Sequence, residues 1–172
     1  MNNKYKFVSV DVNKCVGCRV CEYVCSMEKA KAFNPTRSRI RVVRIYPHTN
    51  AALNCRMCQD APCVPACPRK ALTQSEENGV INVDENLCDG CGWCVKSCDF
   101  GAIALNPKSP KSCVQICDLC NTRGNGNGPA CIEWCPEKAL ELTTNDALSQ
   151  KARIAAVQKL AEIAEESREN QE

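Results

Sequence analysis

The chain has 172 residues, of which 17 are cysteines and 5% are aromatic, and its formal net charge is +2. This low aromatic content predicts a thin hydrocarbon core. Bound metal is therefore expected to supply much of the stability. The odd cysteine count and the lack of a signal peptide favour reduced thiols in a cytoplasmic compartment over a disulfide scaffold. No apolar run reaches the roughly 18 residues of a membrane span, so we expect no direct insertion into a membrane.

The N-terminal third begins with the alternating segment 6–11, which predicts a short strand. A closely spaced cysteine run follows directly, and a short helix is expected after it, ending near Lys31. Residues 38–46 predict a longer strand that Pro47 stops. The first run consists of Cys15, Cys18, Cys21 and Cys25.

The middle of the chain holds two further runs, with short strands predicted at 71–73, 79–84 and 102–105. Segment 79–84 leads into its cysteine run as segment 6–11 does, which indicates an internal duplication. The second run consists of Cys55, Cys58, Cys63 and Cys67, followed by Pro68. The third consists of Cys88, Cys91, Cys94 and Cys98.

The fourth run encloses a glycine- and asparagine-rich loop, 121–129, whose glycine spacing does not match a dinucleotide-binding fingerprint. A short strand is predicted at 139–142 and a helix at 146–168. At helical pitch this helix is amphipathic, with Leu148, Ala152, Ala156, Leu160 and Ile163 on one side and Lys151, Gln158, Glu162 and Glu165 on the other. It either folds back on its own domain or packs on another subunit. The fourth run consists of Cys117, Cys120, Cys131 and Cys135, followed by Pro136.

The first and third runs have the spacing C-x2-C-x2-C-x3-C, which wraps a 4Fe-4S cluster and sends its fourth cysteine to a second cluster. Four runs use sixteen of the 17 cysteines, and Cys113 is predicted to ligate no cluster. Structural zinc also uses pairs of C-x2-C and stays as a distant alternative, but a tetrahedral zinc site has no use for a third closely spaced thiol. His48 is the only histidine, which excludes two-histidine ligation.

Cluster binding would change the charge of the folded protein to about −6, because each oxidised cluster with its thiolates carries about −2. The basic residues are therefore better interpreted as local compensation than as a nucleic-acid surface. The stretch Arg37, Arg39, Arg41 and Arg44 is predicted to be the solvated face of a strand, with a docking patch for an acidic partner as the alternative. Trp93 and Trp134 each precede a ligand cysteine and are expected to screen clusters from water or to pack in a small core.

The four runs, in this order and spacing, resemble the four-cluster electron-transfer subunits of the dimethyl sulfoxide reductase type. Such subunits occur beside tungsten and molybdenum enzymes such as aldehyde oxidoreductases and formate dehydrogenases, beside hydrogenases and beside carbon monoxide dehydrogenases. Segment 33–40 is also similar to the subgroup that accompanies tungsten aldehyde oxidoreductases, benzoyl-CoA reductases and carbon monoxide dehydrogenases.

The resemblance implies an α+β fold of tandem or nested bacterial-ferredoxin-like units, with short strands and helices around four 4Fe-4S clusters and a C-terminal amphipathic helix. The four-cluster domain would cover 1–143, with an inner unit of about 50–105 nested in an outer unit of about 6–49 and 106–143. Residues 144–172 would form the helix for docking or assembly. The ligand sets it implies are Cys15, Cys18, Cys21 and Cys135 for cluster 1; Cys117, Cys120, Cys131 and Cys25 for cluster 2; Cys55, Cys58, Cys63 and Cys98 for cluster 3; and Cys88, Cys91, Cys94 and Cys67 for cluster 4.

The sequence shows no constellation of catalytic carboxylates, histidine or nucleophile, so substrate chemistry is expected on a partner protein. The favoured interpretation is a non-catalytic electron-transfer subunit that works with a catalytic oxidoreductase subunit. A free polyferredoxin that shuttles electrons between enzymes is the alternative. The apolar face of the C-terminal helix favours the subunit, since a diffusing carrier gains nothing from it.

Overall fold

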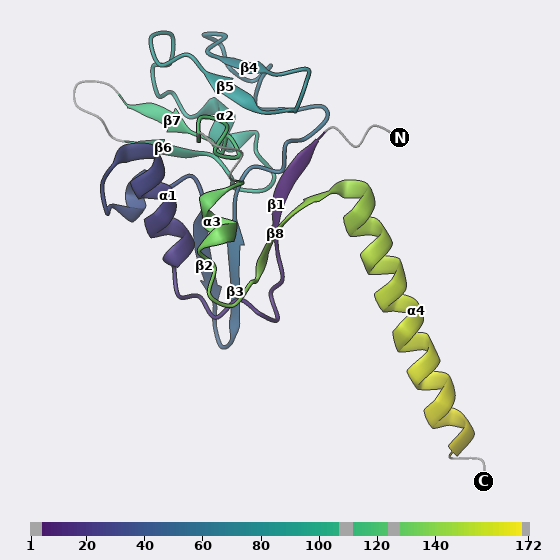
Figure 1. Cartoon of the computed structure of the whole chain (residues 1–172). Helices are drawn as coiled ribbons and strands as arrows, with labels where there is room; N and C mark the ends of the chain where they lie inside the picture. Colours follow the sequence, from purple (N-terminus) through teal and green to yellow (C-terminus); the bar gives the residue numbers. More distant parts are fainter. Residues whose placement is uncertain (1–4, 107–111, 124–127, 170–172) are drawn as a thin grey trace.

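The computed structural model describes residues 5–106, 112–123 and 128–169. In this part of the chain, eight short strands form four separate two-stranded antiparallel sheets. Short helices lie between the strands, and one long helix, α4, extends away from the body (Figure 1). Small antiparallel sheets with short helices confirm the predicted α+β class.

The first sheet joins the two ends of the body, because β1 (Lys6–Val10) pairs with β8 (Leu140–Thr144). In this register Val10 lies opposite Leu140. At that end the backbone N–H of Asp11 donates a 2.8 Å hydrogen bond to the carbonyl of Ala139. The pairing therefore brings the segment before the first cysteine run beside the segment after the fourth.

The other three sheets are hairpins or near-hairpins. They pair β2 (Arg41–Ile45) with β3 (Thr49–Leu53), β4 (Leu72–Gln74) with β5 (Ile81–Val83), and β6 (Ala104–Asn106) with β7 (Cys113–Gln115). The β6–β7 pair connects the segment after the third run to the segment before the fourth. With β1–β8, it fixes where the cysteine runs meet.

The helices in the body begin inside cysteine runs. They are α1 (Val20–Ala30), α2 (Trp93–Lys96) and α3 (Ala130–Glu133), and a 3-10 turn, η1 (Pro35–Arg37), follows α1. The residues that precede α1 and α2 are Arg19 and Gly92, with φ of 65° and 80°. This left-handed conformation turns the chain sharply after a cysteine loop and lets the helix carry the next cysteine.

The core is thin, as the composition predicted, and consists of two clusters of buried residues. Phe7 is the one aromatic side chain among the described residues that is fully buried, whereas Phe33 is 74% and Tyr46 94% exposed. Cysteines fill much of the remaining core. They are Cys55, Cys63, Cys88, Cys94 and Cys113 in the larger cluster and Cys21, Cys25 and Cys131 in the smaller.

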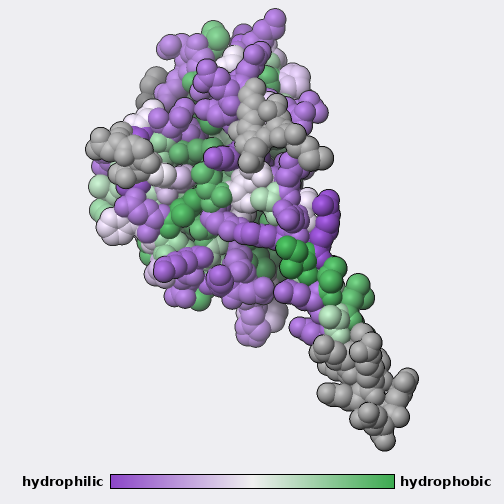
Figure 2. Space-filling model, turned by 45° about the vertical axis from the view of Figure 1, so that its right-hand side comes forward, coloured by the Kyte–Doolittle hydropathy of each residue, from purple (hydrophilic) through white to green (hydrophobic). Residues whose placement is uncertain are grey.

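Helix α4 (Asn145–Glu169) touches the body only near its start. Leu148 packs against the larger core cluster, and the Lys151 ammonium lies 2.6 Å from the Glu141 carboxylate. Beyond that point the apolar side chains are more than half exposed; they are Ile154, Val157, Leu160 and Ile163. Figure 2 shows hydrophobic residues on the part of α4 nearest the body. Folding of this helix back onto its own domain is therefore not observed.

The predicted elements are largely present, with boundaries displaced by one to three residues. Two strands, β3 and β7, were not predicted, and the strand expected over 38–46 begins only at Arg41. It starts late because residues 35–37 form η1, which Asn34 caps by accepting a hydrogen bond from the Thr36 N–H. No helix within the described residues combines the length and apolar character needed to cross a bilayer.

Candidate functional site

The sixteen cysteines of the four runs lie around four separate cavities, each lined by four of them. Every cavity takes three cysteines from one run and one from another run. Cavity 1 is lined by Cys15, Cys18, Cys21 and Cys135; cavity 2 by Cys25, Cys117, Cys120 and Cys131; cavity 3 by Cys55, Cys58, Cys63 and Cys98; and cavity 4 by Cys67, Cys88, Cys91 and Cys94. The structure thus brings together the same sets that the family resemblance implied as ligands.

The chemistry of these sets fits clusters held by thiolates. Three backbone N–H groups donate hydrogen bonds of 3.3 Å to cysteine sulfurs: Arg39 to Cys25, Ala71 to Cys67 and Ala139 to Cys135. Donors of this kind stabilise negative charge on sulfur and tune the potential of an iron–sulfur centre. Among the residues that the structure describes, no three His, Cys, Asp or Glu side chains are placed to hold a single metal ion.

Burial makes several of these thiols poor acids. It raises the pKa of Cys21, Cys55 and Cys117 to about 12 and that of Cys94 to about 11. Burial and the repulsion of neighbouring thiolates also raise the pKa of Cys131 strongly. A group that binds here must supply enough positive charge to hold all four sulfurs as thiolates, as iron does.

The cavities follow one another through pairs of neighbouring cysteines. After burial, the pKa of Cys131 in cavity 2 is raised by charges that include Cys21 of cavity 1. The pKa of Cys117, also in cavity 2, is raised in part by Cys55 of cavity 3. Cavities 3 and 4 share the second and third runs, since each receives one cysteine from the run that supplies three to the other. The order is therefore 1, 2, 3, 4.

Cavities 1 and 4, at the two ends of this order, each have one solvent-exposed cysteine. These are Cys18 and Cys91, whereas all cysteines of cavities 2 and 3 are buried or half-buried. The two tryptophans are also more than half exposed, Trp93 by 58% and Trp134 by 59%. They lie next to Cys94 of cavity 4 and Cys135 of cavity 1 in the sequence. The ends of the series are thus its accessible parts.

Cys113 lines none of the four cysteine cavities. It is buried on β7 and faces a fifth cavity of about 230 Å³, which Lys29, Arg37 and Arg39 also line. That Cys113 ligates no cluster stays a prediction.

The fourth run is tied to α1 by a partly buried charge network. The Asp118 carboxylate lies 2.9 Å from the Lys29 ammonium and 2.8 Å from the Arg39 guanidinium. Burial alone would raise the pKa of Asp118, but its bonds to Lys29 and Arg39 outweigh burial and lower it. This network joins segments about 80 to 90 residues apart and offsets charge beside cavity 2.

The interpretation of the arginine stretch as a solvated strand face holds only in part, because Arg41 and Arg44 lie on β2 but Arg37 and Arg39 precede it, and only Arg44 of the four is exposed. Arg39 pairs with Asp118, and Arg41 donates to the carbonyls of Pro35 and Thr36 at η1. The Arg44 guanidinium donates a 2.6 Å hydrogen bond to the carbonyl of Gly17, inside the first cysteine run. Three of the four arginines therefore hold loops in place, which a count of charges along a strand could not reveal.

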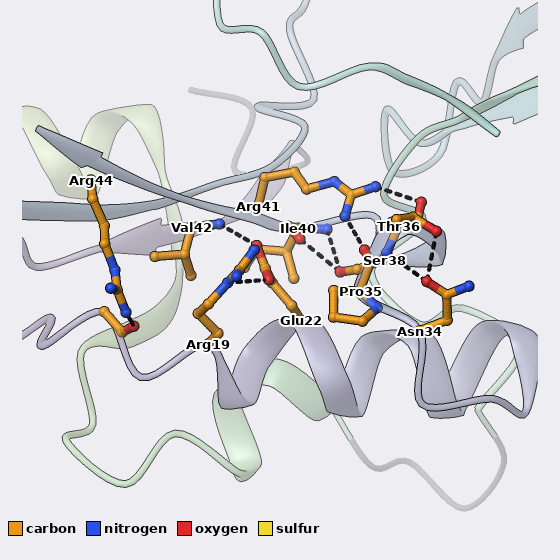
Figure 3. A network of polar contacts seen from close by, with 11 residues as sticks. Arg19, Glu22, Asn34, Pro35, Thr36, Ser38, Ile40, Arg41, Val42 and Arg44 are labelled. Carbon is orange, nitrogen blue, oxygen red and sulfur yellow. Dashed lines mark hydrogen bonds and ion pairs between the residues drawn. The ribbon is translucent and has the colours of Figure 1, made fainter. Parts of the chain in front are cut away.

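A buried carboxylate beside cavity 1 was also missed by the sequence. Glu22 on α1 is 1% exposed, and Figure 3 shows it between Arg19 and the backbone of Val42. Its Oε2 lies 2.8 Å from Arg19 Nε, and its Oε1 accepts a 2.7 Å hydrogen bond from the Val42 N–H. The sequence does mark this residue as unusual. Glu22 directly follows the third cysteine of the first run, Cys21, whereas apolar residues follow the third cysteine of the other runs.

Comparison with known proteins agrees with this site. Residues 48–145 match the family model described as a 4Fe-4S dicluster domain. The chain is 40% identical over 143 residues to the "aliphatic sulfonate oxidoreductase, polyferredoxin-like subunit" of Pyrococcus furiosus, covering 81% of this chain and 79% of the relative. It is 33% identical over 165 residues to the Escherichia coli K12 "electron transport protein HydN", covering 84% and 91%.

Among solved structures, the chain is similar to one from the "active site complex BamBC of benzoyl coenzyme A reductase". The identity is 25%, the TM-score is 0.47, and 93% of this chain and 96% of that chain are covered. The family match and the two sequence relatives, taken with sixteen cysteines arranged around four cavities, lead to one conclusion. The chain belongs to the 4Fe-4S dicluster domain family and is a ferredoxin-like electron-transfer subunit.

Proposed function

We propose that the chain holds four 4Fe-4S clusters in cavities 1 to 4, and that it relays electrons between a catalytic oxidoreductase subunit and a second redox partner. The observation that carries the proposal is the division of the sixteen cysteines into four quartets around separate cavities. A 4Fe-4S cluster bound by thiolates accepts and donates one electron at a time. The order of the cavities supports a single path along the chain.

The protein's own part in this function is to hold and insulate the ligands. Backbone N–H groups bond to Cys25, Cys67 and Cys135, and every cysteine of the inner quartets is buried or half-buried. The exposure of Cys18 and Cys91 supports a path whose two ends are accessible from the surface. We assign entry and exit of electrons to these two ends.

We also propose the nested organisation of two ferredoxin-like units, an inner one of about 50–105 and an outer one of about 6–49 and 106–143. The pairing of β1 with β8 supports the outer unit, and that of β4 with β5 supports the inner one. The outer unit contains cavities 1 and 2, and the inner unit contains cavities 3 and 4. Each unit therefore holds one end cavity and one inner cavity of the series.

The catalytic partner is proposed as an enzyme of the tungsten or molybdenum, carbon monoxide dehydrogenase or hydrogenase type. The Pyrococcus relative is named as a subunit of an oxidoreductase, which supports a non-catalytic role beside such an enzyme. Four exposed apolar residues on α4 support contact with a partner or with another copy of the chain. Because the ligands must stay reduced, we place the protein in the cytoplasm.

Anaerobic purification followed by iron and sulfide analysis tests the proposal. Sixteen ligand cysteines at four per cluster predict about sixteen iron and about sixteen acid-labile sulfur atoms per chain. Reductive titration monitored by electron paramagnetic resonance should then show one-electron couples from four clusters. Stoichiometric zinc without labile sulfide would contradict the proposal and favour a zinc-bound scaffold. Co-purification of a tagged chain distinguishes a subunit from a free carrier.

A further inference from the structure

A surplus of positive charge lies beside cavity 2. Lys29 and Arg39 both line this cavity, and both pair with the same oxygen, Oδ2 of Asp118, at 2.9 Å and 2.8 Å. Two cations therefore share one carboxylate, which leaves the three side chains with a formal charge of +1. The Lys29 side chain is 7% exposed, Asp118 19% and Arg39 29%, so water screens this charge only weakly.

The other described residues around these three side chains do not remove the surplus. Lys29 and Arg39 also line the fifth cavity, to which Arg37 and Glu85 contribute charges of opposite sign. Lys29 donates a further 3.2 Å hydrogen bond to the hydroxyl of Thr122, which carries no charge. A poorly solvated charge requires a counter-charge close to it. The thiolates of cavity 2 supply one.

The charged residues around the other three cavities are of a different kind. They are Arg19 and Glu137 in cavity 1; Arg56, Asp60 and Asp99 in cavity 3; and Arg69 and Asp89 in cavity 4. The formal charge of these linings is therefore zero in cavities 1 and 4 and −1 in cavity 3. Except for Arg56, which is half-buried, all of these residues are exposed. Among the described linings of the four cavities, that of cavity 2 alone is net positive, and its charges are the least solvated.

Cavities 2 and 3 allow the effect of charge to be compared at similar burial. They are neighbours in the middle of the order, and all their cysteines are buried or half-buried. Reduction of a cluster adds negative charge, so a poorly screened positive charge beside it favours the reduced state. Their linings differ in sign, +1 around cavity 2 and −1 around cavity 3.

We propose that Lys29, Arg39 and Asp118 together raise the reduction potential of the cluster in cavity 2 above that of the cluster in cavity 3. The proposal rests on the proposed function, since it requires clusters in both cavities. Reduction adds one electron to a cluster, and no bond forms or breaks. An electron on the path then moves readily from end 1 to cavity 2, is retained there, and crosses to cavity 3 against the difference in potential.

Reductive titration of the cluster-loaded protein, monitored by electron paramagnetic resonance, tests the proposal. Cys120→Ser and Cys63→Ser identify the couples of cavities 2 and 3, since each alters one ligand set. Lys29→Met keeps an apolar stem and removes the positive charge, so the cavity 2 couple should shift to more negative potential. Asp118→Asn removes the negative charge, so the same couple should shift to more positive potential. A purely structural role would weaken both variants without giving shifts of opposite sign.

Arg69→Gln is the matched control. Arg69 also lines a cysteine cavity and pairs with an aspartate, Asp89, that follows the first cysteine of a run, but its side chain is 64% exposed. Water screens that charge, so every couple should move less in Arg69→Gln than the cavity 2 couple moves in Lys29→Met.

Three results would overturn the proposal. The first is a cavity 3 couple more positive than the cavity 2 couple in the unmodified chain. The second is an unchanged cavity 2 couple in Lys29→Met, and the third is a shift in the same direction in the Lys29 and Asp118 variants. If Lys29→Met loses a cluster, Arg39→Gln takes its place and must give the same negative shift. Absence of iron from the unmodified chain would instead refute the proposed function.

Discussion

Replacing Asp118 with asparagine should weaken the folded, cluster-loaded protein substantially. The change keeps the Oδ1 that accepts the Cys120 N–H at 3.2 Å, but it removes the charge that faces Lys29 and Arg39. The Lys29 side chain is only 7% exposed, and Asp118 is 19% exposed. Loss of one partner therefore leaves a poorly solvated ammonium group without a counter-charge.

The expected loss of stability is about 2 to 3 kcal/mol. Removing one member of a fully buried ion pair costs roughly 3 to 5 kcal/mol. The cost is lower here because Lys29 keeps a 3.2 Å hydrogen bond to Thr122, and Arg39 is 29% exposed. Cluster loss makes unfolding irreversible, so the suitable measure is the rate at which visible cluster absorbance disappears in guanidinium under anaerobic conditions.

Asp89→Asn is the matched control for this change. Asp89 follows the first cysteine of the third run as Asp118 follows that of the fourth, and its Oδ1 accepts the Cys91 N–H at 3.2 Å. Its ion pair with Arg69 is exposed, with side-chain exposures of 64% for Arg69 and 38% for Asp89. Exposed pairs contribute little to stability. Asp118→Asn should therefore bleach at least about ten times faster than Asp89→Asn, and equal rates would refute the burial argument.

Two further predictions concern Cys113 and α4. Cys113→Ala should retain the full iron content because Cys113 lines none of the cysteine cavities, whereas Cys117→Ala should lose or convert a cluster; equal iron loss would show that the fourth run is misassigned. Deleting the residues after Thr144 should leave the cluster spectra intact but reduce the assembled mass measured by light scattering, since burying Ile154, Val157, Leu160 and Ile163 could contribute about 6 to 12 kcal/mol before ordering costs. Unchanged mass with lost clusters would mean that α4 stabilises the body.

Cysteine spacing predicts which three thiols of a run lie together, because the geometry of a bound cluster leaves little freedom. Three thiols within seven residues can reach one cluster only if the loop between them curls around it. Residues that favour a left-handed backbone, such as Gly92 before α2, allow the cysteine loop to turn in this way. Assignment of the fourth ligand of each set came from the resemblance, because it depends on which runs lie side by side. The pairing of β1 with β8 brings Cys15 and Cys135 to the same cavity, although they are 120 residues apart in the sequence.

The strands that were missed have little pattern of their own. Residues 49–53, Thr-Asn-Ala-Ala-Leu, contain no alternation of large apolar and polar side chains, and they form β3 because β2 supplies a complete set of backbone partners. Similarly, β7 begins at Cys113 and has three residues, paired with β6. Strand formation here follows from tertiary pairing, which local propensity does not record.

The charged contacts escaped prediction for a different reason. Composition predicts that basic residues compensate the charge of bound clusters, and that stays a prediction; it does not show which partner each basic residue contacts. Arg39 and Arg41 are two residues apart, yet one reaches Asp118 in the fourth run and the other reaches η1. The prediction from charge pattern requires that all four arginines lie on one extended strand. Residues 35–37 instead form the η1 turn, so the strand begins later.

The two end cavities, 1 and 4, each take three cysteines from a run of the same spacing. Cys18 and Cys91 are both exposed, so either end cluster could exchange electrons with a docked protein. Duplication alone would make the ends equivalent and would give electrons no preferred end. The residues between the cysteines differ, however, since Glu22 follows the third cysteine at one end and Val95 follows it at the other. Residues between the ligand cysteines can therefore differ from one end to the other while the cysteine spacing, which carries the resemblance to the family, stays the same.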